Sequence, residues 1–159
     1  MEPSKPPTGL LIRRASEDDL LAIVSLLKAD SMGNAREDLG PPLPDSYVEA
    51  FREIAADPRC ALMVAELDGV VVGTFQRCFL RHLTFRGARV AQLESVHVAA
   101  PRRGQGIGNA MMQWAIEEAR AAGCNRVQLT SHKSRTDSHR FYHRLGFVAS
   151  HEGMKLFLG

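Results

Sequence analysis

The chain has 159 residues, of which 45% are hydrophobic and 24% are charged. This length fits one domain that buries about two-thirds of its unfolded surface around a single core. The formal net charge is only +2 and lysine and arginine form no long runs, so nucleic acid is not favoured as a partner. No segment approaches the roughly 18 consecutive apolar residues of a membrane span, and the N-terminus lacks the apolar core of a signal peptide. We therefore expect a soluble, cytoplasmic protein without a membrane partner.

The three cysteines, Cys60, Cys78 and Cys124, are odd in number and widely spaced among apolar residues. This pattern is typical of reduced thiols that pack in a cytoplasmic protein. We expect no disulfide framework.

The first half of the chain predicts a proline-rich, flexible N-terminal segment over residues 1–9, followed by one domain over residues 10–159. A polar run before apolar residues at helical spacing predicts a capped helix start, and Asp-Gly between two β-rich runs predicts a hairpin. The expected elements are a strand at 10–14, a helix from 16 that ends before the polar loop 30–44, a helix at 45–56, and strands at 61–67 and 70–80.

The second half predicts a turn at Arg86-Gly87 and then alternating elements to the C-terminus. The helix after Gly108 carries one apolar face and ends at Gly123, which suits a C-terminal cap. The expected elements are a strand at 90–98, a helix from about 108 to 122, a strand at 126–131, a short helix at 137–144, and a terminal hairpin at 147–157 that turns at Glu152-Gly153.

The strand at 90–98 changes its apolar phase halfway. Ala91 and Leu93 are odd-numbered, whereas Val96 and Val98 are even-numbered, and a regular strand places these two sets on opposite faces. A β-bulge of one extra residue near Glu94-Ser95 reconciles them and frees backbone groups to meet a ligand. A strand that is buried on both faces explains the same parity.

A glycine loop, Arg103-Gly104-Gln105-Gly106-Ile107-Gly108, connects this strand to the following helix. Unpaired N–H groups at a helix start, together with the positive end of the helix dipole, favour a phosphate or pyrophosphate. The residues after Gly108 lack the lysine and hydroxyl of a nucleoside triphosphate loop. The glycine spacing and the strand at 126–131, which ends without an acid, do not fit a dinucleotide fingerprint.

The remaining pattern, Arg/Gln-x-x-Gly-x-Gly/Ala, is followed downstream by Phe141-Tyr142-His143-Arg144-Leu145-Gly146-Phe147. Both motifs, in this order and spacing, resemble the GNAT superfamily of acetyl-CoA-dependent N-acetyltransferases. The resemblance extends from Leu10 to Leu158. It implies an α/β fold with a mixed, mostly antiparallel sheet of about six to seven strands and about four flanking helices.

The resemblance also implies how acetyl-CoA would be held. The loop amides would bind its pyrophosphate, Arg103 would add positive charge, and the main chain of Val96, His97 and Val98 would pair with the pantetheine arm. The expected cofactor-binding residues are Val96, His97, Val98, Arg103, Gly104, Gln105, Gly106, Ile107, Gly108, Arg135, Ser138 and Tyr142.

Tyr142 lies where the family places a tyrosine near the thioester sulfur, and its phenol can protonate a leaving thiolate. Glu94 lies before the expected bulge, where several family members carry a carboxylate that draws a proton from the amine. The alternatives are a core tyrosine beside Phe141, and a glutamate that only binds the ammonium or lies on the surface.

Several further residues have weaker signals. His97 and His132 could line the cleft and relay a proton, and His132 is an expected substrate contact. His139 and His143 have the spacing of a helical metal pair but lack further ligands, so no metal is expected. Arg135 and Ser138 replace the family's Asn and Ala upstream of the tyrosine, so Arg135 would meet a cofactor phosphate or an anionic substrate instead.

The runs around Glu94 and from Arg135 to Tyr142 look like those of aminoalkylphosphonate N-acetyltransferases and related small-amine enzymes. We therefore expect acetyl transfer to a small primary amine by direct attack in a ternary complex. The alternatives are a peptide or protein N-acetyltransferase, and a non-catalytic acetyl-CoA-binding regulatory module. Sheet-edge pairing through the apolar Leu156-Phe157-Leu158 end would make a homodimer.

Overall fold

The structure is a computed structural model that describes residues 4–30, 32 and 35–159. The first three residues of the expected N-terminal segment lie outside the described part.

The chain forms two compact units, residues 1–128 and 129–159. The first unit contains β1 (Leu11–Arg14), a 3-10 turn (Glu17–Asp19), α1 (Leu20–Ala29), α2 (Asp45–Ala56), β2 (Cys60–Leu67), β3 (Val70–Arg81), α3 (Thr84–Gly87), β4 (Arg89–Val98), a second 3-10 turn (Ala100–Arg102), α4 (Ile107–Ala121) and most of β5 (Cys124–Leu129).

The strands form one sheet in the order β1-β2-β3-β4-β5, and the first four are antiparallel to their neighbours. β2 and β3 meet at the expected hairpin, where Asp68 and Gly69 have φ angles of 52° and 77°. Positive φ at both central positions is the geometry of the two-residue turn that follows the twist of its strands. The mixed α/β architecture expected from the sequence is therefore confirmed, with five strands in place of six to seven.

A partly buried ion pair fixes the start of α1 against the sheet. Asp19 accepts hydrogen bonds from both terminal nitrogens of Arg13 on β1, at 2.8 and 2.9 Å, and from the Ser16 backbone N–H at 2.7 Å. These bonds to its charged form lower the pKa of Asp19 to about 2. The polar run that predicted a helix cap therefore also ties the helix to β1.

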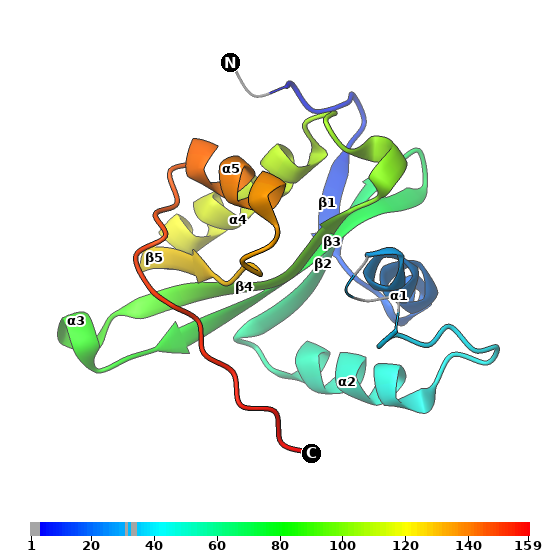
Figure 1. Ribbon diagram of the computed structural model, residues 1–159, viewed down its shortest axis with the longest axis horizontal. Helices are drawn as coiled ribbons and strands as arrows, with labels where there is room; N and C mark the ends of the chain where they lie inside the picture. Colours follow the sequence, from blue (N-terminus) through cyan, green and yellow to red (C-terminus); the bar gives the residue numbers. More distant parts are fainter. Residues whose placement is uncertain (1–3, 31, 33–34) are drawn as a thin grey trace. The chain divides into compact units, whose positions relative to one another are not determined.

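Helices cover both faces of the sheet in the first unit. In Figure 1, α4 lies on one side of the β3–β4 ribbon, and α1 and α2 lie on the other. The core between α4 and the sheet contains Phe75, Leu93, Ile107 and Met111, all fully buried. The Phe75 ring meets Trp114 of α4 edge to face, with centroids 5.9 Å apart. This packing orients α4 and hence the loop at its N-terminus.

The expectation of three reduced thiols is wrong for two of them. Cys60 and Cys78 form a disulfide between β2 and β3, where the two residues are directly paired. Their Cα atoms are 4.2 Å apart, and this proximity follows from the strand register, which the sequence does not reveal. Cys124 is free, and burial raises the pKa of its thiol.

The second unit contains α5 (Thr136–Arg144) and the C-terminal segment. The expected hairpin at 147–157 is wrong, because none of these residues lies in a strand. Val148, Leu156 and Phe157 are exposed. An isolated two-stranded hairpin is only marginally stable without a third strand or a packing surface, which explains why the apolar pattern alone does not produce one here.

Candidate active site

The bulge expected from the phase of β4 is confirmed. Gln76 of β3 pairs with Glu94, whereas Thr74 pairs with His97, so Phe75 lies opposite two residues, Ser95 and Val96. Ser95 takes up the extra length with a φ of 52°, a left-handed conformation that a non-glycine residue rarely adopts. The alternative of a regular strand buried on both faces is thereby excluded.

The bulge decides which side chains share a face. With one residue left over at Ser95, the regular alternation places Leu93 and Val96 on the α4 face, and Glu94 and His97 together on the opposite face. Asp30, at the end of α1, lies near His97 on that face. The two polar residues singled out in this strand are therefore brought to one side of the sheet.

Glu94 is exposed but belongs to a chain of amide side chains. Its Oε1 accepts a hydrogen bond from Gln92 Nε2 at 3.1 Å. The Oε1 of Gln92 in turn accepts one from Gln128 Nε2 of β5 at 2.8 Å. This network orients the carboxylate, and sequence analysis missed it because the contact depends on how β4 and β5 pair.

His97 is held between the bulge and α1. Its Nδ1 donates to the carbonyl oxygen of Ser95 at 3.0 Å, and its Nε2 lies 3.8 Å from Oδ2 of the buried Asp30. The Nε2 atom is buried and has no hydrogen-bond partner among the described residues. An imidazole next to a buried carboxylate is suited to hold or pass a proton. Nothing in the sequence pattern pointed to Asp30.

The glycine loop has the backbone of an anion site. Gly104 and Gly106 have φ angles of 78° and 82°, and the first helical bond of α4 runs from Ala110 N–H to the Gly106 carbonyl. The N–H groups of Ile107, Gly108 and Asn109 therefore precede the helical ladder, at the positive end of the helix dipole. This is the arrangement that the sequence predicted for pyrophosphate binding.

Side chains and main chain also approach the loop. Arg103 donates from Nε to the Val98 carbonyl at 3.2 Å, and Gln105 donates to the Pro101 carbonyl at 3.4 Å. A Cβ atom on Gly106 would lie 2.3 Å from the Ser4 carbonyl oxygen. Only glycine fits at position 106, because the N-terminal segment passes this closely and because φ is positive there.

In the second unit, Tyr142 lies on α5 between two aromatic rings. The ring centroids of Phe141 and Phe147 are 5.1 and 5.6 Å from its own, both in edge-to-face geometry. Burial raises the pKa of Tyr142 to about 12, and the nearby Arg135 lowers it by a smaller amount. The phenol is therefore kept in its protonated form, as a proton donor requires.

The other candidates of this unit surround the start of α5. Arg135 is the residue just before the helix and Ser138 is its third residue. His132 Nδ1 accepts a hydrogen bond from the Ser134 backbone N–H at 3.2 Å. His139 and His143 each contact a backbone carbonyl through a ring nitrogen. Within the described ranges, no group of three or more His, Cys, Asp or Glu residues could hold a metal ion.

A family model described as "Acetyltransferase (GNAT) family" matches residues 21–147. The chain therefore belongs to the GNAT family of acetyltransferases. The expectation from the loop and the Phe-Tyr motif, an N-acetyltransferase of this acetyl-CoA-dependent family, is confirmed.

The chain is also similar to a relative of known activity and to solved structures. The aminoalkylphosphonate N-acetyltransferase of Salmonella typhimurium is 36% identical over 106 residues, which cover 67% of this chain and 68% of the relative. A crystal structure of a transcriptional regulator from Bacillus halodurans is 45% identical with a TM-score of 0.91, covering 94% of this chain and 99% of that chain. A putative acetyltransferase from Agrobacterium tumefaciens is 27% identical with a TM-score of 0.77, covering 93% and 99%.

The left-handed conformation of Ser95 generates a test of the bulge. Because Ser95 is exposed, substitutions there change backbone strain more than burial. Ser95→Gly should leave the free energy of unfolding nearly unchanged, since the relief of strain is offset by the freer unfolded chain. Ser95→Val should lower it by about 1–2 kcal/mol, because a β-branched residue is disfavoured at positive φ. Urea unfolding of both variants measures the difference, and equal stability would contradict the bulge.

Proposed function

We propose that this protein transfers the acetyl group of acetyl-CoA to the primary amine of a small molecule, by direct attack in a ternary complex. The observation that carries this proposal is the continuous unit of bulged strand β4, glycine loop and α4 N-terminus. It combines backbone amides at a helix start, which suit an anion, with a bulged strand that carries a carboxylate. We take residues 10–159 to act as one catalytic domain.

The residues of the loop fit the cofactor. Acetyl-CoA supplies an acetyl thioester on a long arm with a pyrophosphate at its base. The amides from Gly104 to Gly108 and the Arg103 charge would bind the pyrophosphate, and the main chain of residues 96–98 would pair with the arm as an added strand. Arg135 and Ser138 would contribute further polar contacts from the start of α5.

Glu94 is assigned to the amine. An alkyl ammonium with a pKa near 10.4 must lose a proton before it attacks, so an acceptor at the amine accelerates the reaction at neutral pH. The amide network through Gln92 holds the Glu94 carboxylate in place. His97 shares this face, and its Nε2, which accepts no hydrogen bond from the residues that the structure describes, offers a second acceptor along the same route.

Tyr142 is assigned to the leaving thiolate. Its pKa of about 12 lies well above neutral pH, so the phenol stays protonated through the working range and loses its proton only as the pH rises toward 12. A covalent route through Cys124 is disfavoured, because burial raises the pKa of that thiol and thereby suppresses the thiolate nucleophile. Direct attack by the amine is the simpler path.

A small primary amine is the acceptor that the relatives support best. The relative at 36% identity is an aminoalkylphosphonate N-acetyltransferase, and an aminoglycoside N(6')-acetyltransferase from Serratia marcescens is 32% identical over 109 residues. Both names describe acetyl transfer to small molecules. On this chain, Glu94 and His132 would contact the acceptor. A peptide or protein amine is the alternative within the same chemistry.

A second candidate function follows from one comparison. The 45% identical structure is described as a transcriptional regulator, which favours a module that binds acetyl-CoA without transferring the acetyl group. Such a module would need the glycine loop but not Glu94 or Tyr142. Loss of these two residues would then leave its function intact, which separates it from the enzyme.

The location and assembly of the enzyme are part of the proposal. No helix in the described part of the chain has the length and apolar character needed to cross a bilayer. We propose a cytoplasmic homodimer, in which the exposed Leu156, Phe157 and Leu158 gain a partner strand from the second copy. Paired with such a strand, the C-terminal segment would bury apolar surface that it leaves exposed in one chain.

An amine panel tests the proposed function. Free thiol released from acetyl-CoA is measured with aminoalkylphosphonates, aminoglycosides, glucosamine 6-phosphate and peptides with free α-amines. We expect release that depends on a small primary amine. Binding of acetyl-CoA without release across the panel would favour the regulatory module, and release only with peptides would favour the peptide N-acetyltransferase.

The division of labour between Glu94 and Tyr142 predicts different pH–rate profiles. Glu94→Gln should lose activity at neutral pH and recover as rising pH deprotonates the amine directly. Tyr142→Phe should lose about 10²-fold, and high pH should not restore it, because the leaving thiolate still lacks its proton donor. The measurement is kcat and kcat/KM between pH 6 and 10 with the best amine.

The matched control is Glu117→Gln, which removes a carboxylate from the exposed surface of α4, where Glu117 pairs with Arg120. This variant should keep the wild-type profile. If both site variants kept wild-type rates at unchanged acetyl-CoA affinity, neither residue would be catalytic, and positioning of the two substrates would account for the rate.

A further inference from the structure

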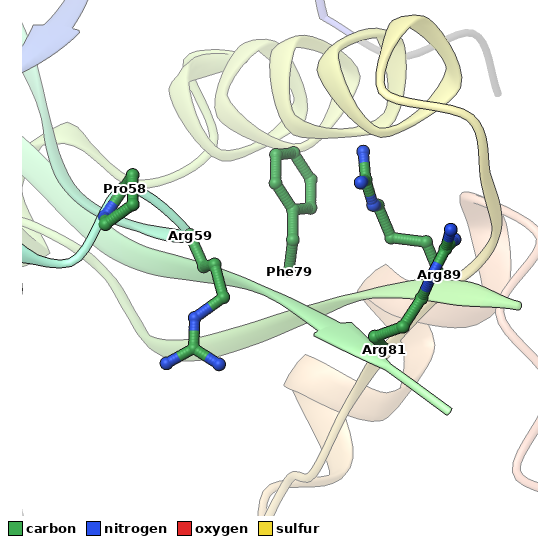
Figure 2. A pocket seen from close by; sticks show the side chains of 5 residues that line it. All are labelled: Pro58, Arg59, Phe79, Arg81 and Arg89. Carbon is green, nitrogen blue, oxygen red and sulfur yellow. The ribbon is translucent and has the colours of Figure 1, made fainter. Parts of the chain in front are cut away.

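A second region rich in arginine lies away from the glycine loop. Pro58, Arg59, Phe79, Arg81 and Arg89 line a pocket of about 260 Å³ between the end of β3 and the starts of β2 and β4. Figure 2 shows the Arg81 and Arg89 side chains next to each other, with the Arg59 guanidinium pointing to the other side. Phe79 forms an apolar wall between them.

Arg81 and Arg89 bring two positive charges together at the end of the β3–β4 hairpin. The two residues are directly opposite each other on antiparallel strands, a position where like charges destabilise the pair. Among the residues that the structure describes, neither has an acidic partner. Arg89 donates from Nη1 to the Ala122 carbonyl at the end of α4, at 2.9 Å, and its other donors remain available.

The neighbouring arginine shows the contrast. Arg77, four residues before Arg81 on the same face of β3, is buried and forms two hydrogen bonds with the Glu118 carboxylate, at 2.9 and 2.8 Å. Its guanidinium also lies 3.9 Å from the centroid of the Phe79 ring. The positive charge of Arg77 is therefore satisfied within the protein, whereas the charges of Arg81 and Arg89 face the pocket.

The walls of the pocket are held in place before any ligand arrives. The Arg59 carbonyl oxygen accepts hydrogen bonds from the Phe79 backbone N–H at 2.9 Å and from Arg77 Nη1 at 3.0 Å. The Cys60–Cys78 disulfide joins the two strands next to these residues. A preorganised site loses less entropy when it binds a ligand.

We propose that this pocket binds a small organic phosphate monoester. The phosphate dianion would lie between the guanidinium groups of Arg81 and Arg89, which suit bidentate contacts to oxyanions, and the organic group would pack on Phe79. The volume of about 260 Å³ lies just below the usual range of small-molecule pockets, so the organic group has to be small. Two arginine charges are also needed because the C-terminal end of α4 is the negative end of its dipole.

This pocket is separate from the proposed acetyl-CoA loop and from Glu94. α4 has 15 residues and is therefore about 22 Å long, with the glycine loop at its N-terminus and Ala122, the contact of Arg89, at its C-terminus. Arg89, Ala91 and Leu93 alternate onto the α4 face, whereas Glu94 lies on the opposite face. The proposal does not depend on the acetyltransferase activity.

Isothermal titration with phenyl phosphate tests the proposal. The wild-type protein should bind one equivalent, with or without saturating CoA, and should bind inorganic phosphate more weakly. Arg81→Gln and Arg89→Gln should each weaken binding of phenyl phosphate by about tenfold or more, because each removes charged hydrogen bonds to the dianion. Phe79→Leu should weaken phenyl phosphate but leave inorganic phosphate unchanged.

The control is Arg52→Gln, an exposed arginine of α2 that pairs with Glu17, which should bind like the wild type. Equal losses in Arg52→Gln would show nonspecific attraction to positive charge and would overturn the proposal. The absence of binding would also overturn the proposal. Binding that CoA abolishes and that Arg81→Gln leaves unchanged would overturn it too, as would Arg81-dependent binding of a DNA oligonucleotide in preference to phenyl phosphate. Circular dichroism of each variant shows that the fold is retained.

Discussion

The extra residue in β4 is the constraint on which the site depends. With Ser95 in a left-handed conformation, Leu93 and Val96 both remain on the apolar face that packs against α4, and Glu94 and His97 both reach the other face. A regular strand would place Leu93 and Val96 on opposite faces, and likewise Glu94 and His97. The same packing against α4 orients the helix whose N-terminus carries the glycine loop, so core and site are set by one backbone irregularity.

The two ends of α4 illustrate two ways to attract an anion. At the N-terminus, backbone amides and the helix dipole act in the same direction, and the proposed pyrophosphate would meet both. At the C-terminus the dipole opposes an anion, so side-chain charge has to supply the attraction. Arg81 and Arg89 provide that charge, and the β2–β3 disulfide and the bonds to the Arg59 carbonyl keep the second pocket in shape.

Local patterns predicted the features that depend on a few consecutive residues. Parity in β4 located the bulge, Asp68-Gly69 located the hairpin, and the glycine spacing located the loop. The sequence did not reveal contacts that require the strand register or a distant segment, such as Cys60 with Cys78, Gln92 with Gln128, and Asp30 with His97. The terminal hairpin was wrong because an apolar run does not specify what it will pack against.

The most direct test of the central claim is an amide NMR titration of the labelled protein with acetyl-CoA. If the bulged strand and the glycine loop bind the cofactor through their main chain, the largest shifts will be at Val96–Val98 and at Gly104–Asn109, and they will saturate together. Saturable shifts confined to other residues, with these amides unchanged, would contradict the account.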